Sequence, residues 1–290
     1  MFKKIDARRV YRIWALGVFC LILACALLCV TLLVLDLSQP DEPSVLQEQQ
    51  QQPSADPPQD PPSDPADTDA YIAGSRVLAQ TPDAGQGYID RMIFLGESTT
   101  SHLRSRGVLS GGTKTQQVWS NKENTMMLDL NILQKTVYWS SSDENVTIAE
   151  AIERAKPEIL VLCFGVNGLN TFDKNEELYR VAYGRLIDAV HEASPNTVVL
   201  LQTVYPVASN QDTFSQGARA VNAVIDRLNQ SLVTIAEQHN AYVVDTASVL
   251  KDERGMLKNE YQNGDGLHLE TVAYEQILMY LRTHAYDLSR

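Results

Sequence analysis

Cysteine is scarce in this chain of 290 residues, and the four cysteines present cannot form a disulfide framework. Cys20, Cys25 and Cys29 fall within one long apolar run, and Cys163 stands by itself in a later apolar segment. No Cys/His pair has the short spacing typical of a zinc site, so no metal is expected. The chain beyond the apolar run must depend on its hydrophobic core, for which roughly 200 residues are enough.

Basic residues are also few. The chain has 24 Lys and Arg against 36 Asp and Glu, for a formal net charge of -12. Binding to nucleic acid requires a basic face to contact the phosphates, so this balance argues against nucleic acid as a partner.

Charge is absent from residues 13–35, IWALGVFCLILACALLCVTLLVL. At about 1.5 Å per residue a helix of this length covers roughly 34 Å, which is enough to cross a bilayer core of roughly 30 Å. Five Lys and Arg residues precede it within residues 1–12. The positive-inside rule therefore predicts a cytoplasmic N-terminus, a membrane span at 13–35 and the remainder outside the cell.

Two other interpretations of this segment are possible. A cleaved signal peptide has a shorter apolar region and a small-residue cleavage site, and no such site follows here. The residues Ile22-Leu23-Ala24-Cys25 resemble a lipobox, which would attach lipid to Cys25. Ten further uncharged residues follow Cys25, nine of them apolar, and they favour an uncleaved signal anchor.

Residues 36–87 are predicted to be a disordered linker. Eight of the twelve prolines, a glutamine run and eight acids lie within 38–70. Such a composition buries too little apolar surface to offset the entropy of ordering. The globular domain is predicted to span 88–290.

This domain alternates short apolar runs with amphipathic stretches. The runs at 91–96, 158–165, 197–203 and 241–246 are rich in Val, Ile and Leu and are predicted to be buried strands. Helical spacing recurs at 146–155, 176–193, 218–239 and 271–285. The repeated strand–helix order predicts a doubly wound parallel α/β sheet with helices on both faces.

Polar residues follow two of the predicted strands and precede the last helix. They are Gly96-Glu97-Ser98, Gly165-Val166-Asn167 and Asp265-Gly266-Leu267-His268. Ligands in such folds bind outside the carboxyl ends of the strands, so these residues are expected at one edge. Ser98 can be a nucleophile if His268 is its base and Asp265 orients the imidazole. The amide of Asn167 and the N–H of Ser98 are candidate oxyanion donors.

The same three groups of residues resemble the GDS, GxN and DxxH blocks of the SGNH (GDSL-type) hydrolases, in order and spacing. The resemblance implies a flavodoxin-like three-layer α/β/α sandwich, a catalytic Ser98, Asp265 and His268, and no cofactor. It also implies an oxyanion hole that includes Asn167 and the Ser98 amide. Two departures stand out: Glu97 replaces the usual Asp, and residues 116–132 contain no glycine to supply the usual further oxyanion donor.

Other residues are candidates for the cleft beside Ser98. Asn124 or Thr125 can replace the missing glycine amide, and His102 lies one helical turn from Ser98 as a rival base. Thr99 is also predicted to line the cleft, and Trp119 is predicted either to line it or to pack in the core. The G-x-S-x-G elbow of α/β-hydrolases is absent around Ser98.

These observations predict a membrane-anchored, extracytoplasmic serine esterase of bacterial origin. Its substrate is predicted to be a small acyl ester or an acylated cell-envelope glycan. One alternative is an O-acyltransferase that uses the same serine. The other is a non-catalytic envelope-binding domain, which the missing glycine would favour.

Overall fold

The computed structural model describes residues 72–139 and 141–289. The predicted cytoplasmic segment 1–12, the predicted span 13–35 and the linker up to residue 71 lie outside the described residues. Within the described ranges, every helix is too short or too polar to traverse a lipid bilayer.

The central sheet has five parallel strands in the order β2-β1-β5-β6-β7. These strands are β1 (Met92–Gly96), β2 (Val118–Trp119), β5 (Ile159–Cys163), β6 (Val198–Gln202) and β7 (Tyr242–Val244). The order matches the flavodoxin-like arrangement, in which the chain starts in the middle of the sheet and reverses direction after the second strand. The prediction of a parallel α/β sheet is confirmed.

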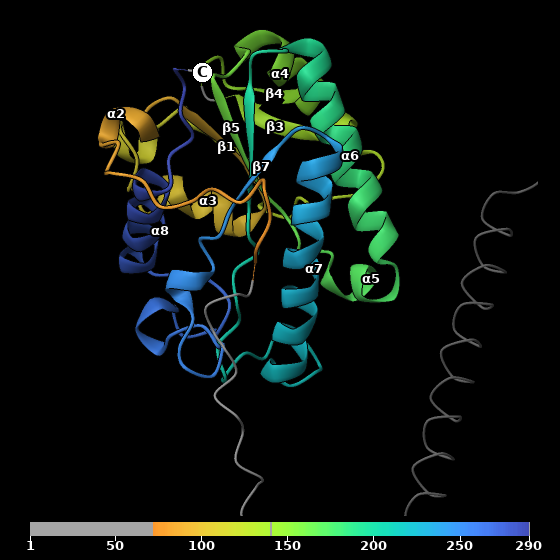
Figure 1. The fold of residues 1–290 in the computed structure, drawn as a ribbon, viewed down its shortest axis with the longest axis vertical. Helices are drawn as coiled ribbons and strands as arrows, with labels where there is room; N and C mark the ends of the chain where they lie inside the picture. Colours follow the sequence, from red (N-terminus) through yellow and green to blue (C-terminus); the bar gives the residue numbers. More distant parts are fainter. Residues whose placement is uncertain (1–71, 140, 290) are drawn as a thin grey trace, which may run out of the picture. The chain divides into compact units, whose positions relative to one another are not determined.

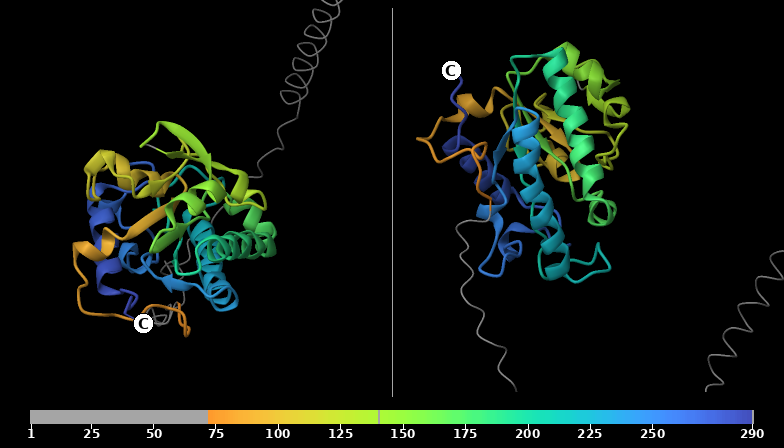
Figure 2. Two further views of the ribbon diagram at one scale, coloured as in Figure 1. Left: turned by 90° about the horizontal axis from the view of Figure 1, so that it is seen from above. Right: turned by 45° about the vertical axis from the view of Figure 1, so that its right-hand side comes forward.

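Helices cover both faces of the sheet (Figure 1). One face carries α4 (Ile148–Ala155), α6 (Glu176–Ala193) and α7 (Ala218–Gln238), and the other carries α2 (Gln86–Ile89), α3 (Ser98–Ser105) and α8 (Thr271–Thr283). Figure 2 shows α6 and α7 side by side on the same face. All five residues of β5 are buried, because apolar side chains alternate between these two helical layers.

Shorter elements connect this framework. Helix α5 (Leu169–Lys174) follows β5, and single 3-10 turns lie at Gly112–Lys114, Ile132–Gln134, Ser248–Leu250 and Asn259–Tyr261. An antiparallel pair, β3 (Thr136–Trp139) and β4 (Glu144–Thr147), precedes α4. The sequence analysis did not predict β2, β3 or β4, because each is short and their side chains do not alternate regularly between apolar and polar.

The predicted domain boundary at residue 88 is too late. Val77 forms a parallel bridge with Val243 of β7, and the N–H of Leu78 donates to the Val243 carbonyl at 2.9 Å. These two residues extend the sheet edge, although the sequence analysis assigned them to the linker.

The sheet order reverses between β1 and β5. Gly96, the last residue of β1, pairs with Cys163, the last residue of β5. In flavodoxin-like folds the loops that follow two such strands lead to opposite faces of the sheet, and ligands bind in the crevice between them. Ser98 follows β1 and Asn167 follows β5, so the fold brings two of the predicted site residues to this position.

Candidate active site

Ser98 is the first residue of α3, and a tight connection separates it from β1. A Cβ on Gly96 would overlap the carbonyl oxygen of Cys163 and the side chain of Thr100. Only glycine therefore allows α3 to begin this close to the sheet. The first N–H groups of a helix lack intrahelical acceptors, so the Ser98 N–H belongs to the set that can bind an anion.

His268 and Asp265 lie in the loop before α8. One oxygen of Asp265 accepts hydrogen bonds from the N–H groups of Leu267 and His268, each at 2.8 Å. Gly266 has φ +75°, and a Cβ there would contact the backbone of Gln211 at 2.6 Å. The loop thus requires glycine at position 266. In this conformation the loop holds the Asp265 carboxylate beside the His268 imidazole.

The three side chains form one hydrogen-bonded chain. His268 Nδ1 lies 2.7 Å from the second oxygen of Asp265, and His268 Nε2 lies 3.1 Å from Ser98 Oγ. Burial raises the pKa of Asp265, but the hydrogen bonds from His268 and Leu267 outweigh it and leave the pKa below its ordinary value. The carboxylate therefore favours the tautomer with the proton on Nδ1, which leaves Nε2 free to accept the proton of Ser98.

Glu97 anchors the loop that follows β5. Its carboxylate is buried and accepts hydrogen bonds from the N–H groups of Gly165, Val166 and Asn167, at 2.7, 2.8 and 2.7 Å. Burial raises the pKa of Glu97 to about 7, against the opposing effect of the three donors. Glutamate thus joins the two loops at the crevice, and its presence in place of Asp does not disrupt the position of Ser98.

Asn167 is exposed near the end of the loop between β5 and α5. Its side-chain amide donates one hydrogen bond to the Met126 carbonyl at 2.7 Å. An amide group carries two hydrogens, so one remains for a second acceptor. The bond to Met126 links the β5 loop to the segment after β2 and restricts the orientation of the amide.

Within residues 116–132, the segment with no glycine, the chain forms a turn at 121–125 that is held by its own hydrogen bonds. Asn124 has φ 56°, a left-handed conformation that Asn tolerates better than most residues. The N–H of Asn124 donates to the Asn121 carbonyl, and the N–H of Thr125 donates to the Asn121 side chain. Both amides are therefore engaged within the turn, which contradicts the prediction that one of them replaces the glycine amide.

The remaining predicted cleft residues differ in position. Thr99 and Trp119 are each 3% exposed, so they present almost no surface to a cleft. The cleft prediction is wrong for both, and the alternative for Trp119, packing in the core, is confirmed. The rings of His102 and His268 have centroids 5.0 Å apart. Burial, and then the neighbouring His268 and Arg106, lower the pKa of His102. His102 therefore lies against the proposed base, and His268 is the imidazole that reaches Ser98.

Sequence reasoning missed two features of this region. One is the set of hydrogen bonds that Glu97 accepts from three backbone N–H groups after β5. In the sequence, only the glycine content of that loop hints at such a contact. The other is a polar cavity beside α3 that includes Arg104 and Lys122. Within residues 72–139 and 141–289, no group of three or more His, Cys, Asp or Glu side chains is arranged to hold a metal ion.

A parallel α/β sandwich with a hydrogen-bonded Ser–His–Asp chain at its switch point has the arrangement of a serine hydrolase. A model of the GDSL-like Lipase/Acylhydrolase family matches residues 94–276. The match covers more than half of the chain, so the protein belongs to this family of generally ester-hydrolysing enzymes.

Several solved structures resemble this chain. A Streptococcus pneumonia protein described as a proposed platelet activating factor is 19% identical, with a TM-score of 0.49, over 68% of this chain and 84% of its own. A carbohydrate esterase family 3 protein from Talaromyces cellulolyticus is 15% identical, with a TM-score of 0.45, over 66% and 93%. A GDSL-like lipase from Bacteroides thetaiotaomicron is 15% identical, with a TM-score of 0.45, over 70% and 89%. No protein of curated function matches the chain.

Proposed function

We propose that this protein is a serine esterase that forms an acyl-enzyme on Ser98. The observation that carries the proposal is the continuous hydrogen-bonded chain from Ser98 Oγ through His268 to Asp265. Each member has a chemical role that matches its position. The hydroxyl is the nucleophile, the imidazole is the base, and the carboxylate stabilises the imidazolium that forms.

In the first step Ser98 Oγ attacks the ester carbonyl carbon, and His268 Nε2 takes the hydroxyl proton. The carbonyl oxygen gains negative charge, which the Ser98 N–H and the free hydrogen of the Asn167 amide stabilise. Collapse of the intermediate releases the alcohol, which receives the proton from His268. Water then attacks the acyl group by the same route, and the products are a carboxylic acid and the free enzyme.

The proposed substrate is an O-acyl group on a cell-envelope glycan, cleaved by a domain tethered outside the membrane. The support comes from the sequence: the uncharged run 13–35, the basic residues before it, and the proline-rich, acidic segment 38–70. Protease added to intact cells should then release the domain by cutting within 38–70. A domain that is cut only after the cells are lysed would contradict this placement.

Mutation of the three side chains tests the proposed chemistry. We expect Ser98→Ala to lower kcat on phenyl acetate by at least about a thousandfold, with a similar loss for His268→Ala. Ser209→Ala, a change at an exposed serine, should leave the rate unchanged. A fluorophosphonate probe should label wild type and Ser209→Ala but not Ser98→Ala.

Turnover that survives in Ser98→Ala would exclude Ser98 as the nucleophile. An enzyme that neither reacts with the probe nor cleaves any ester would instead support a non-catalytic domain. An added alcohol or sugar that captures the acyl group in place of water would identify the protein as a transferase.

A further inference from the structure

A polar cavity of about 290 Å³ lies beside α3, outside the hydrogen-bonded chain of the site. Ser101 and Arg104 of α3 line one side. Asn121 and Lys122, after β2, and Tyr138 of β3 line other parts. The cavity is at the lower end of the size range of ligand pockets, so it can hold a small polar group.

The positive charge of this cavity is only weakly neutralised. No acidic residue lines it, and no described acid forms an ion pair with Arg104. Arg104 donates from one terminal nitrogen to the Val118 carbonyl, while its Nε is buried without a partner among the described residues. Lys122 lies over the Tyr138 ring at 4.4 Å, and its closest acid is Asp143 at 3.6 Å.

Asp143 neutralises Lys122 only weakly. Its side chain is 81% exposed and also accepts a hydrogen bond from the Tyr138 hydroxyl at 2.9 Å. Exposed ion pairs of this kind contribute little because solvent screens them. Two cations therefore remain available in the cavity of a chain whose net charge is -12.

The cavity is close to the proposed nucleophile. The Ser101 hydroxyl donates to the Ser98 carbonyl at 2.7 Å, and the two residues are three positions apart on one helix face. On the opposite side, Ser120 directly follows β2, which pairs with β1 through Leu95 and Trp119. The cavity and Ser98 thus share one face of α3 and the adjoining edge of the sheet.

We propose that this cavity is a subsite for an anionic group, a carboxylate or a phosphate, on the ester substrate. The inference rests on the proposed esterase function and specifies its substrate class. A guanidinium and an ammonium next to the Asn121 side-chain amide form a set suited to oxyanions. A purely structural role for Arg104 would use only its contact with Val118 and would not account for Lys122.

Matched esters test the subsite with the full chain in nonionic detergent. Phenyl acetate is the neutral reference. The substrates 4-carboxyphenyl acetate and 4-acetoxyphenyl phosphate place a carboxylate or a phosphate on the alcohol side. Phenyl butyrate and phenyl hydrogen succinate form the corresponding pair on the acyl side. We expect at least one anionic ester to exceed its neutral partner roughly tenfold in kcat/KM.

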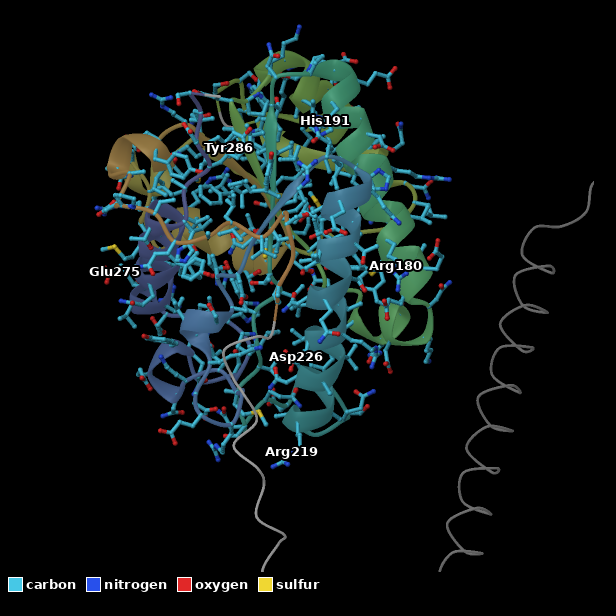
Figure 3. All side chains as sticks on the ribbon, in the orientation of Figure 1. Arg180, His191, Arg219, Asp226, Glu275 and Tyr286 are labelled. Atoms are coloured by element: carbon cyan, nitrogen blue, oxygen red, sulfur yellow. The ribbon has the colours of Figure 1, made fainter. Side chains whose placement is uncertain are left out.

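Lys122→Gln and Arg104→Gln should each abolish most of this preference by raising KM for the anionic ester. Hydrolysis of the neutral ester should stay within about twofold of wild type. Arg219→Gln removes the same charge in the first turn of α7 (Figure 3), at a residue that does not line the cavity, and should keep the preference. Thermal unfolding checks each fold, and Lys122→Gln decides the outcome if Arg104→Gln does not fold.

An equal anionic-to-neutral ratio in wild type, Lys122→Gln and Arg219→Gln would overturn the subsite while leaving the esterase intact. Failure to cleave any ester would refute the esterase. In that case calorimetry on Ser98→Ala with phenyl phosphate, benzoate and benzyl alcohol still tests the subsite. Binding of an anion that Lys122→Gln abolishes supports it, and no binding of either anion overturns it.

Discussion

The carboxylate of Glu97 joins the loop after β1 to the loop after β5, because it accepts three backbone hydrogen bonds from Gly165, Val166 and Asn167. Its neighbour in sequence is Ser98, and one of its donors is the backbone of Asn167. The position of the nucleophile and the position of an oxyanion donor therefore depend on the same side chain.

Replacement of this carboxylate tests its structural role. In Glu97→Gln the amide oxygen can still accept some of the three backbone hydrogen bonds. The amide nitrogen is itself a donor, so it cannot pair with the backbone N–H that it faces. At pH 4.5 we expect a loss of about 1–3 kcal/mol in the free energy of unfolding. Glu123→Gln, at an exposed position, should change stability by less than about 0.5 kcal/mol. Equal stabilities of the two variants in urea unfolding would contradict this role.

The same variant gives a prediction for pH. Burial raises the pKa of Glu97 from 4.5 to about 7, so between these values the folded protein holds a proton that the unfolded chain has lost. This contribution to stability is fully present below pH 4.5 and is lost as pH rises to 7, by up to about 3 kcal/mol. The stability of wild type relative to Glu97→Gln should therefore fall from pH 4.5 to 7. A flat or rising difference would show that the folded-state pKa is not raised.

The junction of β1 and α3 is the element that presents the nucleophile. It depends on Gly96, where a Cβ would overlap the Cys163 carbonyl of β5. The contact is with backbone, so a side-chain rotation cannot relieve it. Helix α8 supports α3 from outside the sheet, since the Tyr274 hydroxyl donates to the Thr99 carbonyl at 2.7 Å.

Gly96→Ala should therefore displace α3 from the sheet. We expect a loss of about 1–3 kcal/mol in the free energy of unfolding and a larger relative loss of kcat, because Ser98 moves away from His268. Gly87→Ala in α2, where a Cβ meets no atom within 4 Å, is the matched control and should be neutral or stabilising. Activity of Gly96→Ala equal to that of Gly87→Ala would contradict the proposed constraint.

At the scale of the molecule, the described residues 72–139 and 141–289 contain two hydrophobic cores and the contacts described above that position the proposed site. One core lies under α4, α6 and α7, and the other lies under α2, α3 and α8. A fragment of residues 65–290 should therefore unfold cooperatively and cleave phenyl acetate within about twofold of the full chain in kcat/KM. A fragment that unfolds gradually, or one that folds without the activity of the full chain, would contradict this.

Much of the fold was predictable because its strong patterns are local. The uniformly apolar run of β5 and the helical spacing of apolar residues in α6 and α7 can be recognised from the local sequence, without knowledge of tertiary contacts. The strands β2, β3 and β4 were not predicted, because two to four residues carry too little periodicity. Val77 and Leu78 were assigned to the linker because their pairing with β7 joins segments more than 160 residues apart.

The sequence by itself determined the alternation of the longer strands and helices. It also pointed to Ser98, Asn167, Asp265 and His268 as candidate site residues, because they follow buried strands or precede a helix. Only the tertiary structure decided which imidazole reaches Ser98, since His102 and His268 differ in orientation and not in residue type. It also decided that the amides of Asn124 and Thr125 are engaged within a turn, and that Arg104 and Lys122 share a cavity. These outcomes depend on distances between side chains far apart in the sequence, which local patterns do not encode.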